Sequence, residues 1–189
     1  MIGGPFALRV DVNELRQVGF EWAKAPEALL KRLANAIDET AAVGQAEARL
    51  GAPVFTGELA NSIQIRAAQL VASPPALLMR GEVVTNVAHG VVMEEGRRPG
   101  ARQPPFGPIR RWVYLLVRRG RMDVRWTGEK DEQDQIDSAA FVIARSIGRK
   151  GISPRRFMAK AAEKIEPLLH ARVQGVMEWF AGFLEGGPR

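Results

Sequence analysis

The 189-residue chain contains no cysteine, two histidines and one tyrosine. Without cysteine, the chain cannot form disulfide bridges, thiolate metal sites or a cysteine nucleophile. No apolar run approaches the roughly 20 residues that a helix needs to span a bilayer. Residues 1–13 also lack the basic leader and apolar segment of a secretory signal. We therefore expect a globular protein that is assembled without disulfides and has no membrane partner.

Residues that could form a catalytic or metal site are scarce. His89 and His170 have no second metal ligand at a standard spacing. Glu94 and Glu95 are adjacent, so they point in different directions on a helix or a strand and form a poor acid–base pair. The glycines near Gly96 lack the lysine and Ser/Thr of a phosphate-binding loop. We expect no enzyme, no cofactor and no metal; a hydrolase using His89, Glu94 and Glu95 is the least favoured alternative.

Positive charge is concentrated in one region of the chain. The formal net charge is +6, and the segment from Arg97 to Arg156 carries 15 Lys and Arg against 6 Asp and Glu. Most of these cations are Arg, which binds phosphate or carboxylate through two parallel hydrogen bonds. A solvated basic face and a contact with a polyanion or an acidic partner explain this equally well. No helix-turn-helix or zinc-finger pattern is present, so only non-specific phosphate contact stays open.

Apolar periodicity predicts the first elements. Residues 6–12 alternate as a strand would, and residues 13–22 could form a short helix with Asn13 as its N-cap. A long helix is predicted over residues 26–50, ended by Gly51 and Pro53. Its apolar stripe consists of Leu30, Leu33, Ile37, Ala41, Gly44 and Ala48.

A pair of strands should follow this helix. Residues 54–62 form a glycine turn that leads into a strand in which Ile63 and Ile65 alternate with polar residues. A second strand is predicted over residues 77–87. The turn signal Ser73-Pro74-Pro75 lies between the two, so they should form an antiparallel pair.

The C-terminal half is predicted to be mainly helical. Residues 109–117 are apolar, and Pro108 favours a helix because proline suits a helix start. Helical spacing returns over residues 136–151. The final helical stripe contains a proline, Pro167, which marks either a kink or a new start. Its members are Leu169, Val173, Val176, Phe180 and Phe183.

These elements predict an α+β fold with a long amphipathic helix packed on a small antiparallel sheet and helices at the C-terminus. We expect a single domain, residues 1–189. Its predicted parts are an N-terminal extension (1–25), a helix-plus-sheet core (26–117), a charged insertion (118–135) and a C-terminal helical part (136–189).

The loop over residues 96–108 is rich in Pro, Gly and Arg. Its prolines remove backbone donors and its glycines loosen the chain, so the loop should not form regular structure. Long loops inside a compact domain are usually functional or disordered. Since no catalytic set accompanies it, we interpret this loop as an arm that contacts another subunit.

Three motifs resemble, in order, those of the phage tail-component family typified by gene product 10 of bacteriophage HK97. The first is P-V-F-T-G-E-L-A-N-S-I, from Pro53 to Ile63. The second runs from Val87-Ala88 to Glu94-Glu95-Gly96, and the third is G-I-S-P-R-R-F-M, from Gly151 to Met158. With the long helix before them, the resemblance covers residues 26–165.

The resemblance implies a structural virion protein: a neck or tail-completion subunit that joins head connector and tail around the DNA channel. Such subunits commonly form rings of six. The implied partners are copies of the chain, adjacent head-closure or connector proteins, tail-terminator or tail-tube proteins, and DNA bound without sequence specificity. The implied location is the virion, with assembly in the host cytoplasm. A basic protein that binds nucleic acid non-specifically is the alternative.

Two sets of residues are candidates for these contacts. The candidate subunit interface consists of Phe55, Thr56, Gly57, Leu59, Glu94, Glu95, Gly96, Arg97, Arg98, Pro104, Pro105, Phe106, Arg155, Arg156 and Phe157. Glu94 and Glu95 are expected there as ion-pair acceptors. The candidate contacts to channel DNA or an acidic partner are Arg102, Arg118, Arg119, Arg121, Arg149 and Lys150.

Overall fold

The computed structural model confirms the predicted α+β class and describes residues 6–11, 27–54, 56–73, 76–123 and 131–186. The chain divides into two compact units. Unit 1 is formed by residues 1–94 and 155–189, and unit 2 by the intervening residues 95–154. The chain therefore passes between the units twice. This division differs from the sequence-based boundaries at residues 117 and 136, because the helices on both sides of the charged segment belong to unit 2.

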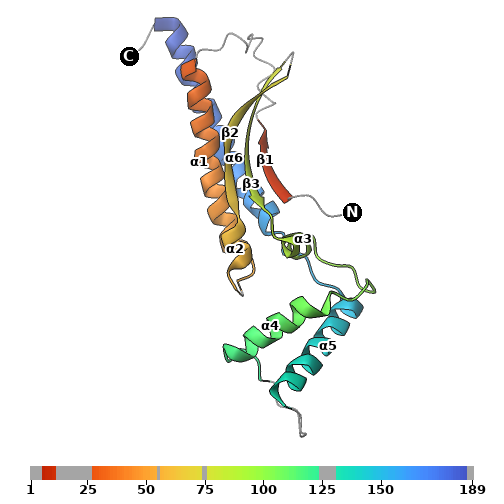
Figure 1. Ribbon diagram of the computed structural model, residues 1–189. Coiled ribbons are helices and arrows are strands. Elements are labelled where there is room, and N and C mark those ends of the chain that lie inside the picture. The colour runs from red at the N-terminus through yellow and green to blue at the C-terminus, as the bar shows by residue number, and fades with distance from the viewer. Residues whose placement is uncertain (1–5, 12–26, 55, 74–75, 124–130, 187–189) are drawn as a thin grey trace. The chain divides into compact units, whose positions relative to one another are not determined.

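Unit 1 contains a three-stranded antiparallel sheet (Figure 1). Its strands are β1 (Phe6–Asp11), β2 (Gln64–Ser73) and β3 (Ala76–Thr85), in the order β1-β3-β2. The hairpin of β2 and β3 pairs Ser73 with Ala76, which confirms the predicted antiparallel pair. The predicted first strand is also confirmed as β1, whereas the predicted helix over residues 13–22 lies outside the described residues.

Helix α1 (Glu27–Gly51) confirms the predicted long helix to within one residue at each end. Its buried residues recur at spacings of three and four, which places them on one face. They are Leu29, Leu33, Ala36, Ile37, Thr40, Ala41, Gly44 and Ala48. The small residues of this face let the helix approach its neighbours closely.

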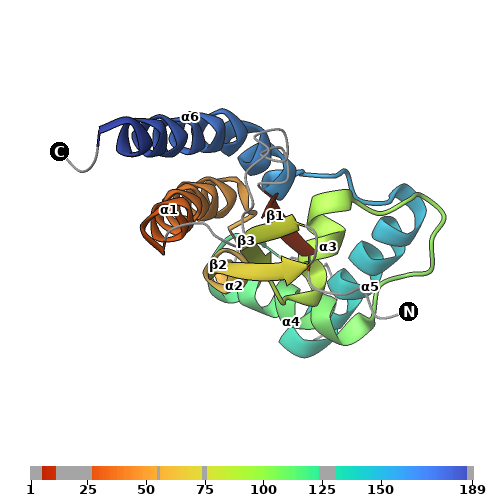
Figure 2. The ribbon, with the colours of Figure 1, turned by 90° about the horizontal axis from the view of Figure 1, so that it is seen from above.

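Helices α1 and α6 (Phe157–Gly186) lie on the same side of the sheet (Figure 2). One part of the core joins Ile37 of α1, Met79 of β3 and Ile165 of α6. Another part joins Ala48, Val83 and the first residues of α6. Pro167 lies inside α6, so it interrupts the backbone bonding of a continuous helix and does not start a new one.

The edge strand β2 carries a bulge between Arg66 and Gln69. Within it, the Ala68 N–H donates to the Asp38 carboxylate of α1, at 2.7 Å. Bulges and covered edges limit pairing with another chain. The middle of this sheet edge is therefore bonded to its own helix.

Two short helices were not predicted. Helix α2 (Glu58–Ser62) follows the left-handed Gly57, which confirms the glycine turn. Helix α3 (Ala88–Glu95) follows the second strand, which was predicted to end at residue 87 and ends at Thr85. The two helices pack closely, because Gly90 of α3 lies against Leu59 of α2 and against Thr85.

Unit 2 contains helices α4 (Phe106–Arg118) and α5 (Glu132–Lys150), which confirm the two predicted helices. Their shared core consists of Val113, Ile136, Ala139 and Ala140. Helix α4 begins three residues before Ile109, because Pro108 is accommodated in a first turn that needs no N–H donors. The predicted arm therefore ends at Pro105, and residues 132–135 of the predicted charged insertion belong to α5.

The contact between Gly81 of β3 and Ile37 of α1 provides a test of the sheet–helix packing. A Cβ added at Gly81 would lie 2.5 Å from Cγ2 of Ile37, a fully buried and stiff side chain. We expect Gly81→Ala to lower the free energy of unfolding by about 1–3 kcal/mol. Ile37→Ala alone should cost about 2–5 kcal/mol.

The double variant distinguishes this clash from a general loss of stability. Ile37→Ala removes the obstructing methyl group, so adding Gly81→Ala to it should cost little or nothing. Urea unfolding of the wild type, both single variants and the double variant measures the coupling. Strictly additive costs would contradict the packing described.

Candidate functional site

Glu94 is the one carboxylate among the described residues that is buried, with 3% of its surface exposed. It accepts hydrogen bonds from the backbone N–H groups of Met158 and Ala159, each at 2.9 Å. These groups belong to the first turn of α6, where N–H donors have no partner within the helix. A carboxylate is favourable there because the helix N-terminus carries partial positive charge. Glu94 of α3 thus caps α6 across 64 residues of sequence.

The residues before α6 explain why this cap comes from elsewhere. Arg156 precedes the helix and has a positive φ of 52°, and no Ser, Thr, Asp or Asn stands at that position. The backbone there is also fixed by α3: the Arg155 N–H donates to the Met93 carbonyl at 2.8 Å, and the Arg156 N–H to the Glu94 carbonyl at 3.2 Å. Four hydrogen bonds therefore tie the end of α3 to the start of α6.

These contacts correct the expectation for Glu94. It was expected to accept an ion pair at a subunit interface, but its carboxylate is buried and bonded to backbone donors. Its neighbour Glu95 is exposed, as expected of side chains that point in different directions. The same burial argues against Glu94 as a catalytic residue in the hydrolase alternative. His89 is exposed, whereas the Glu94 side chain is buried in the core.

Two further candidate interface residues are also in the core. Leu59 and Phe157 are each 2% exposed and pack in the same cluster. Because both side chains are buried within the chain, they do not face another subunit. The sequence motif showed that these positions are apolar, but not that the core of the same chain covers them. Thr56 is exposed and its hydroxyl accepts from the Glu58 N–H at 3.3 Å. Phe55 lies outside the described residues.

The loop between Glu95 and α4 packs along the end of α5. Arg97 and Ile152 exchange backbone hydrogen bonds of 2.8 and 2.9 Å. The Gly100 N–H donates to the Gly148 carbonyl at 2.9 Å. Gly148 is buried under Gln103, whose Cγ a Cβ at Gly148 would approach to 2.9 Å. This part of the predicted arm is irregular, as expected, but it is bonded within unit 2.

The remaining candidate interface residues of this loop differ in exposure. Gly96 has a φ of 78° and fits closely against Ile152 and Pro154. The Arg97 guanidinium donates to the Arg102 carbonyl and is partly buried. Pro104 is partly buried, whereas Arg98, Pro105 and Phe106 are exposed, as are Arg155 and Arg156 of unit 1. The exposed members of this set are free to contact a partner.

The positive charge of the chain belongs to unit 2. Residues 95–154 contain thirteen Lys and Arg against seven Asp and Glu, which gives the whole net charge of +6. Unit 1 contains fourteen of each sign and is neutral. A polyanion or acidic partner would therefore be attracted to unit 2.

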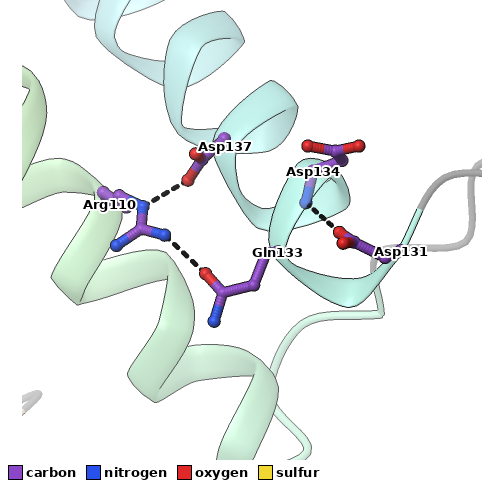
Figure 3. A network of polar contacts seen from close by, with 5 residues as sticks. All are labelled: Arg110, Asp131, Gln133, Asp134 and Asp137. Atoms are coloured by element: carbon purple, nitrogen blue, oxygen red, sulfur yellow. Dashed lines mark hydrogen bonds and ion pairs between the residues drawn. The ribbon is translucent and has the colours of Figure 1, made fainter.

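One cation of the helix pair, Arg110, is matched by an acidic and a polar group (Figure 3). The Arg110 guanidinium of α4 donates to the Asp137 carboxylate and to the Gln133 side chain of α5. Asp131 caps α5 by accepting from the Asp134 N–H at 2.8 Å. Two of the four acidic side chains around the start of α5, those of Asp131 and Asp137, are therefore bonded within unit 2.

Arg118 lies at the C-terminal end of α4. Its guanidinium is 5.4 Å from the centre of the Tyr114 ring, and its Nε donates to the Tyr114 hydroxyl at 3.3 Å. That hydrogen bond raises the pKa of Arg118 above its usual value. Arg119 and Arg121, which follow α4, are also exposed. These three are separated in sequence from Arg102, which precedes α4, and from Arg149 and Lys150, in the last turn of α5.

Unit 2 also exposes large apolar side chains. Phe141 and Val142 of α5 are 53% and 52% exposed, and Phe106, Trp112 and Tyr114 of α4 are exposed in part. In unit 1, Leu50 and Val54, beside the turn that carries the first motif, are the most exposed apolar residues described. Clusters of exposed apolar groups mark protein contact sites.

Within the described ranges, no group of three or more His, Asp or Glu side chains could hold a metal ion. No described helix is long and apolar enough to cross a membrane. Comparisons of the chain with protein-family models, with curated proteins and with solved structures returned no match.

Replacement of the capping carboxylate tests the tie between α3 and α6. Glu94→Gln keeps the size of the side chain but removes its charge and offers one acceptor oxygen to two N–H donors. We expect a loss of about 1–3 kcal/mol in the free energy of unfolding. Glu95→Gln is the matched control and should change stability by less than about 0.5 kcal/mol. Equal effects in urea unfolding would show that the buried cap is unimportant.

A glycine substitution tests the packing of the loop on α5. Gly151 has a φ of 73°, and a Cβ there would lie 2.1 Å from the Arg97 carbonyl oxygen. Gly151→Ala should therefore cost more than about 3 kcal/mol and increase hydrogen exchange at the Gly100 amide. Gly120→Ala is the control, because Gly120 also has positive φ but has nothing within 4 Å. It should cost only about 1–2 kcal/mol, and a larger effect than at Gly151 would refute the contact.

Proposed function

We propose that this chain is a structural virion protein of a tailed bacteriophage, a ring-forming neck or tail-completion subunit. It joins head connector and tail around the DNA channel and acts in assembly, not as an enzyme. The class comes from the ordered motifs at residues 53–63, 87–96 and 151–158, which resemble the gene-product-10-like tail-component family. In this proposal it assembles in the host cytoplasm and remains in the virion.

The observation that carries the proposal is the incompletely covered apolar surface of unit 2. The helix pair buries Val113, Leu116 and Ile136, but its other buried residues in α5 are mainly small: Ala139, Ala140, Ala144 and Gly148. A unit of this size buries only about 60% of the surface of its unfolded chain, less than a larger domain does. Large side chains such as Phe141 and Val142 remain outside, and a neighbouring subunit would cover them.

A ring requires two different patches on each subunit, since one patch must meet another on the next copy. The exposed apolar residues fall into such separate sets. One set includes Phe141 and Val142 of unit 2, and the other includes Leu50 and Val54 of unit 1. This arrangement supports head-to-tail contacts between copies, and partners above and below the ring would use the remaining surfaces.

The proposal is tested by the composition of the virion and by the assembly of the purified chain. We expect the chain in purified particles, and closed rings of the chain alone or with a connector protein by electron microscopy. A monomer in isolation is compatible with rings that close only on a partner. Absence of the chain from purified particles would show that the proposal is wrong.

A single substitution tests the apolar surface of α5. We expect Phe141→Ser to weaken association of the subunits by roughly tenfold or more, because large aromatic side chains contribute most to interfaces. Leu168→Ser is the control, since Leu168 is 42% exposed on α6 and belongs to neither set. Sedimentation velocity at several protein concentrations gives the comparison. Equal weakening by both substitutions would contradict a specific contact at Phe141.

The second candidate is a basic protein that binds nucleic acid without sequence specificity. It is favoured by the confinement of the net charge to unit 2. Binding through phosphate contacts weakens steeply with salt, because counterions are released on binding. Affinity for DNA that does not change between low and moderate salt would exclude this function.

A further inference from the structure

Four exposed cations of unit 2 are brought together by backbone contacts between two segments. Arg98 and Arg102 are on the loop after Glu95, and Arg149 and Lys150 are in the last turn of α5. Arg98, Arg102 and Arg149 are each adjacent in sequence to a residue of the contact, and Lys150 lies between its residues Gly148 and Ile152. The contact consists of the Arg97–Ile152 bridge, the Gly100–Gly148 hydrogen bond and the packing of Gln103 on Gly148. We call these four residues the basic patch.

Two glycines make the close approach of these segments possible. A Cβ at Gly148 would lie 3.4 Å from the Ala101 carbonyl oxygen as well as 2.9 Å from Gln103. At Gly151, it would lie 2.9 Å from the Pro99 nitrogen. The loop backbone is thus held against the helix end, and the cations on both segments are placed on one fixed frame.

The basic patch lacks an acidic partner of the kind that Arg110 of α4 has. Residues 95–105 and 145–152 together contain six Lys and Arg and a single acidic residue, Glu95. Among the described residues, none of the four patch side chains forms an ion pair, whereas Arg110 is paired with Asp137. The acidic residues of unit 2 are instead concentrated around the start of α5.

Part of this charge has a purely structural explanation. Arg149 and Lys150 lie in the last turn of α5, where cations interact favourably with the helix dipole. That explanation does not extend to Arg98 and Arg102, which add two more positive charges on the loop that is bonded to this helix end. Bringing like charges together costs energy, and a bound anion would offset that cost.

We propose that the basic patch is the site at which this chain contacts the phosphodiester backbone of double-stranded DNA. Three of its four members are Arg, which binds phosphate oxygens in bidentate fashion. A regular row of phosphates can engage several side chains at once, and such contacts carry no sequence information. The inference rests on the proposed function for the identity of the polyanion, while the patch itself is defined by the structure.

The test compares two variants with the same change in charge. In the patch variant, Arg98, Arg102 and Arg149 are replaced by Gln, and in the control variant, Lys31, Arg111 and Lys160, which belong to neither set of candidate contact residues, are replaced by Gln. All six side chains are exposed, so both variants should keep the helical circular dichroism of the wild type. Binding of fluorescein-labelled double-stranded DNA is measured by anisotropy over a series of salt concentrations.

We expect the slope of log K against log salt to become shallower by about 2.7 in the patch variant, because three phosphate contacts are lost. At low salt, its affinity should fall by roughly tenfold or more, and the slope of the control variant should change by less than about one. Equal changes in the two variants would overturn the site, since they would reflect net charge alone. A wild-type chain without salt-dependent binding would overturn it as well.

Competition separates DNA from an acidic protein partner. Polyglutamate at the same charge concentration as the DNA should displace the labelled duplex poorly. If it displaces the duplex as well as unlabelled DNA does, the patch recognises carboxylates and the proposal is wrong. Rings that form without DNA binding would refute only this inference, and DNA binding at the patch by a chain absent from virions would refute only the assembly function.

Discussion

The structure of unit 1 depends on the carboxylate of Glu94 at the N-terminus of α6. That helix supplies Phe157, Met158 and Ile165 to the core, yet it begins directly after two arginines that cannot cap it. A helix start without a cap leaves several N–H groups without partners. The end of α3 provides the missing acceptors, and it therefore fixes where α6 begins and which of its faces meets α1 and the sheet.

Much of the fold could be predicted from the sequence, because the regular spacing of apolar residues identifies long amphipathic elements. The stripe of α1, the β2–β3 pair and the helices α4 and α5 are examples. The short helices α2 and α3 could not, since one or two turns of Leu, Val and Ala fit a strand equally well. The burial of Glu94 could not be predicted either. Its partners are backbone donors 64 and 65 residues away, and backbone donors are not visible in a pattern of side chains.

The candidate contact residues show the same limit. The sequence identified the basic region, but it could not separate cations that have partners within unit 2 from those that do not. Arg110 and Arg98 look alike in the sequence, and only the structure pairs the first with Asp137. Leu59 and Phe157 were chosen as interface candidates because they belong to the motifs, and the structure places both in the core. Motif membership and surface contact are separate properties, and three-dimensional position distinguishes them.

The order of the two units along the chain has a consequence for synthesis. Unit 1 is discontinuous, since its core includes Phe157, Met158 and Ala161, which follow all of unit 2. On the ribosome, α1 and the sheet emerge well before α6, and their apolar face remains uncovered during that interval. Unit 2 depends on contacts closer in sequence, and such contacts form quickly. The helix pair can therefore fold first, and α6 closes unit 1 only afterwards.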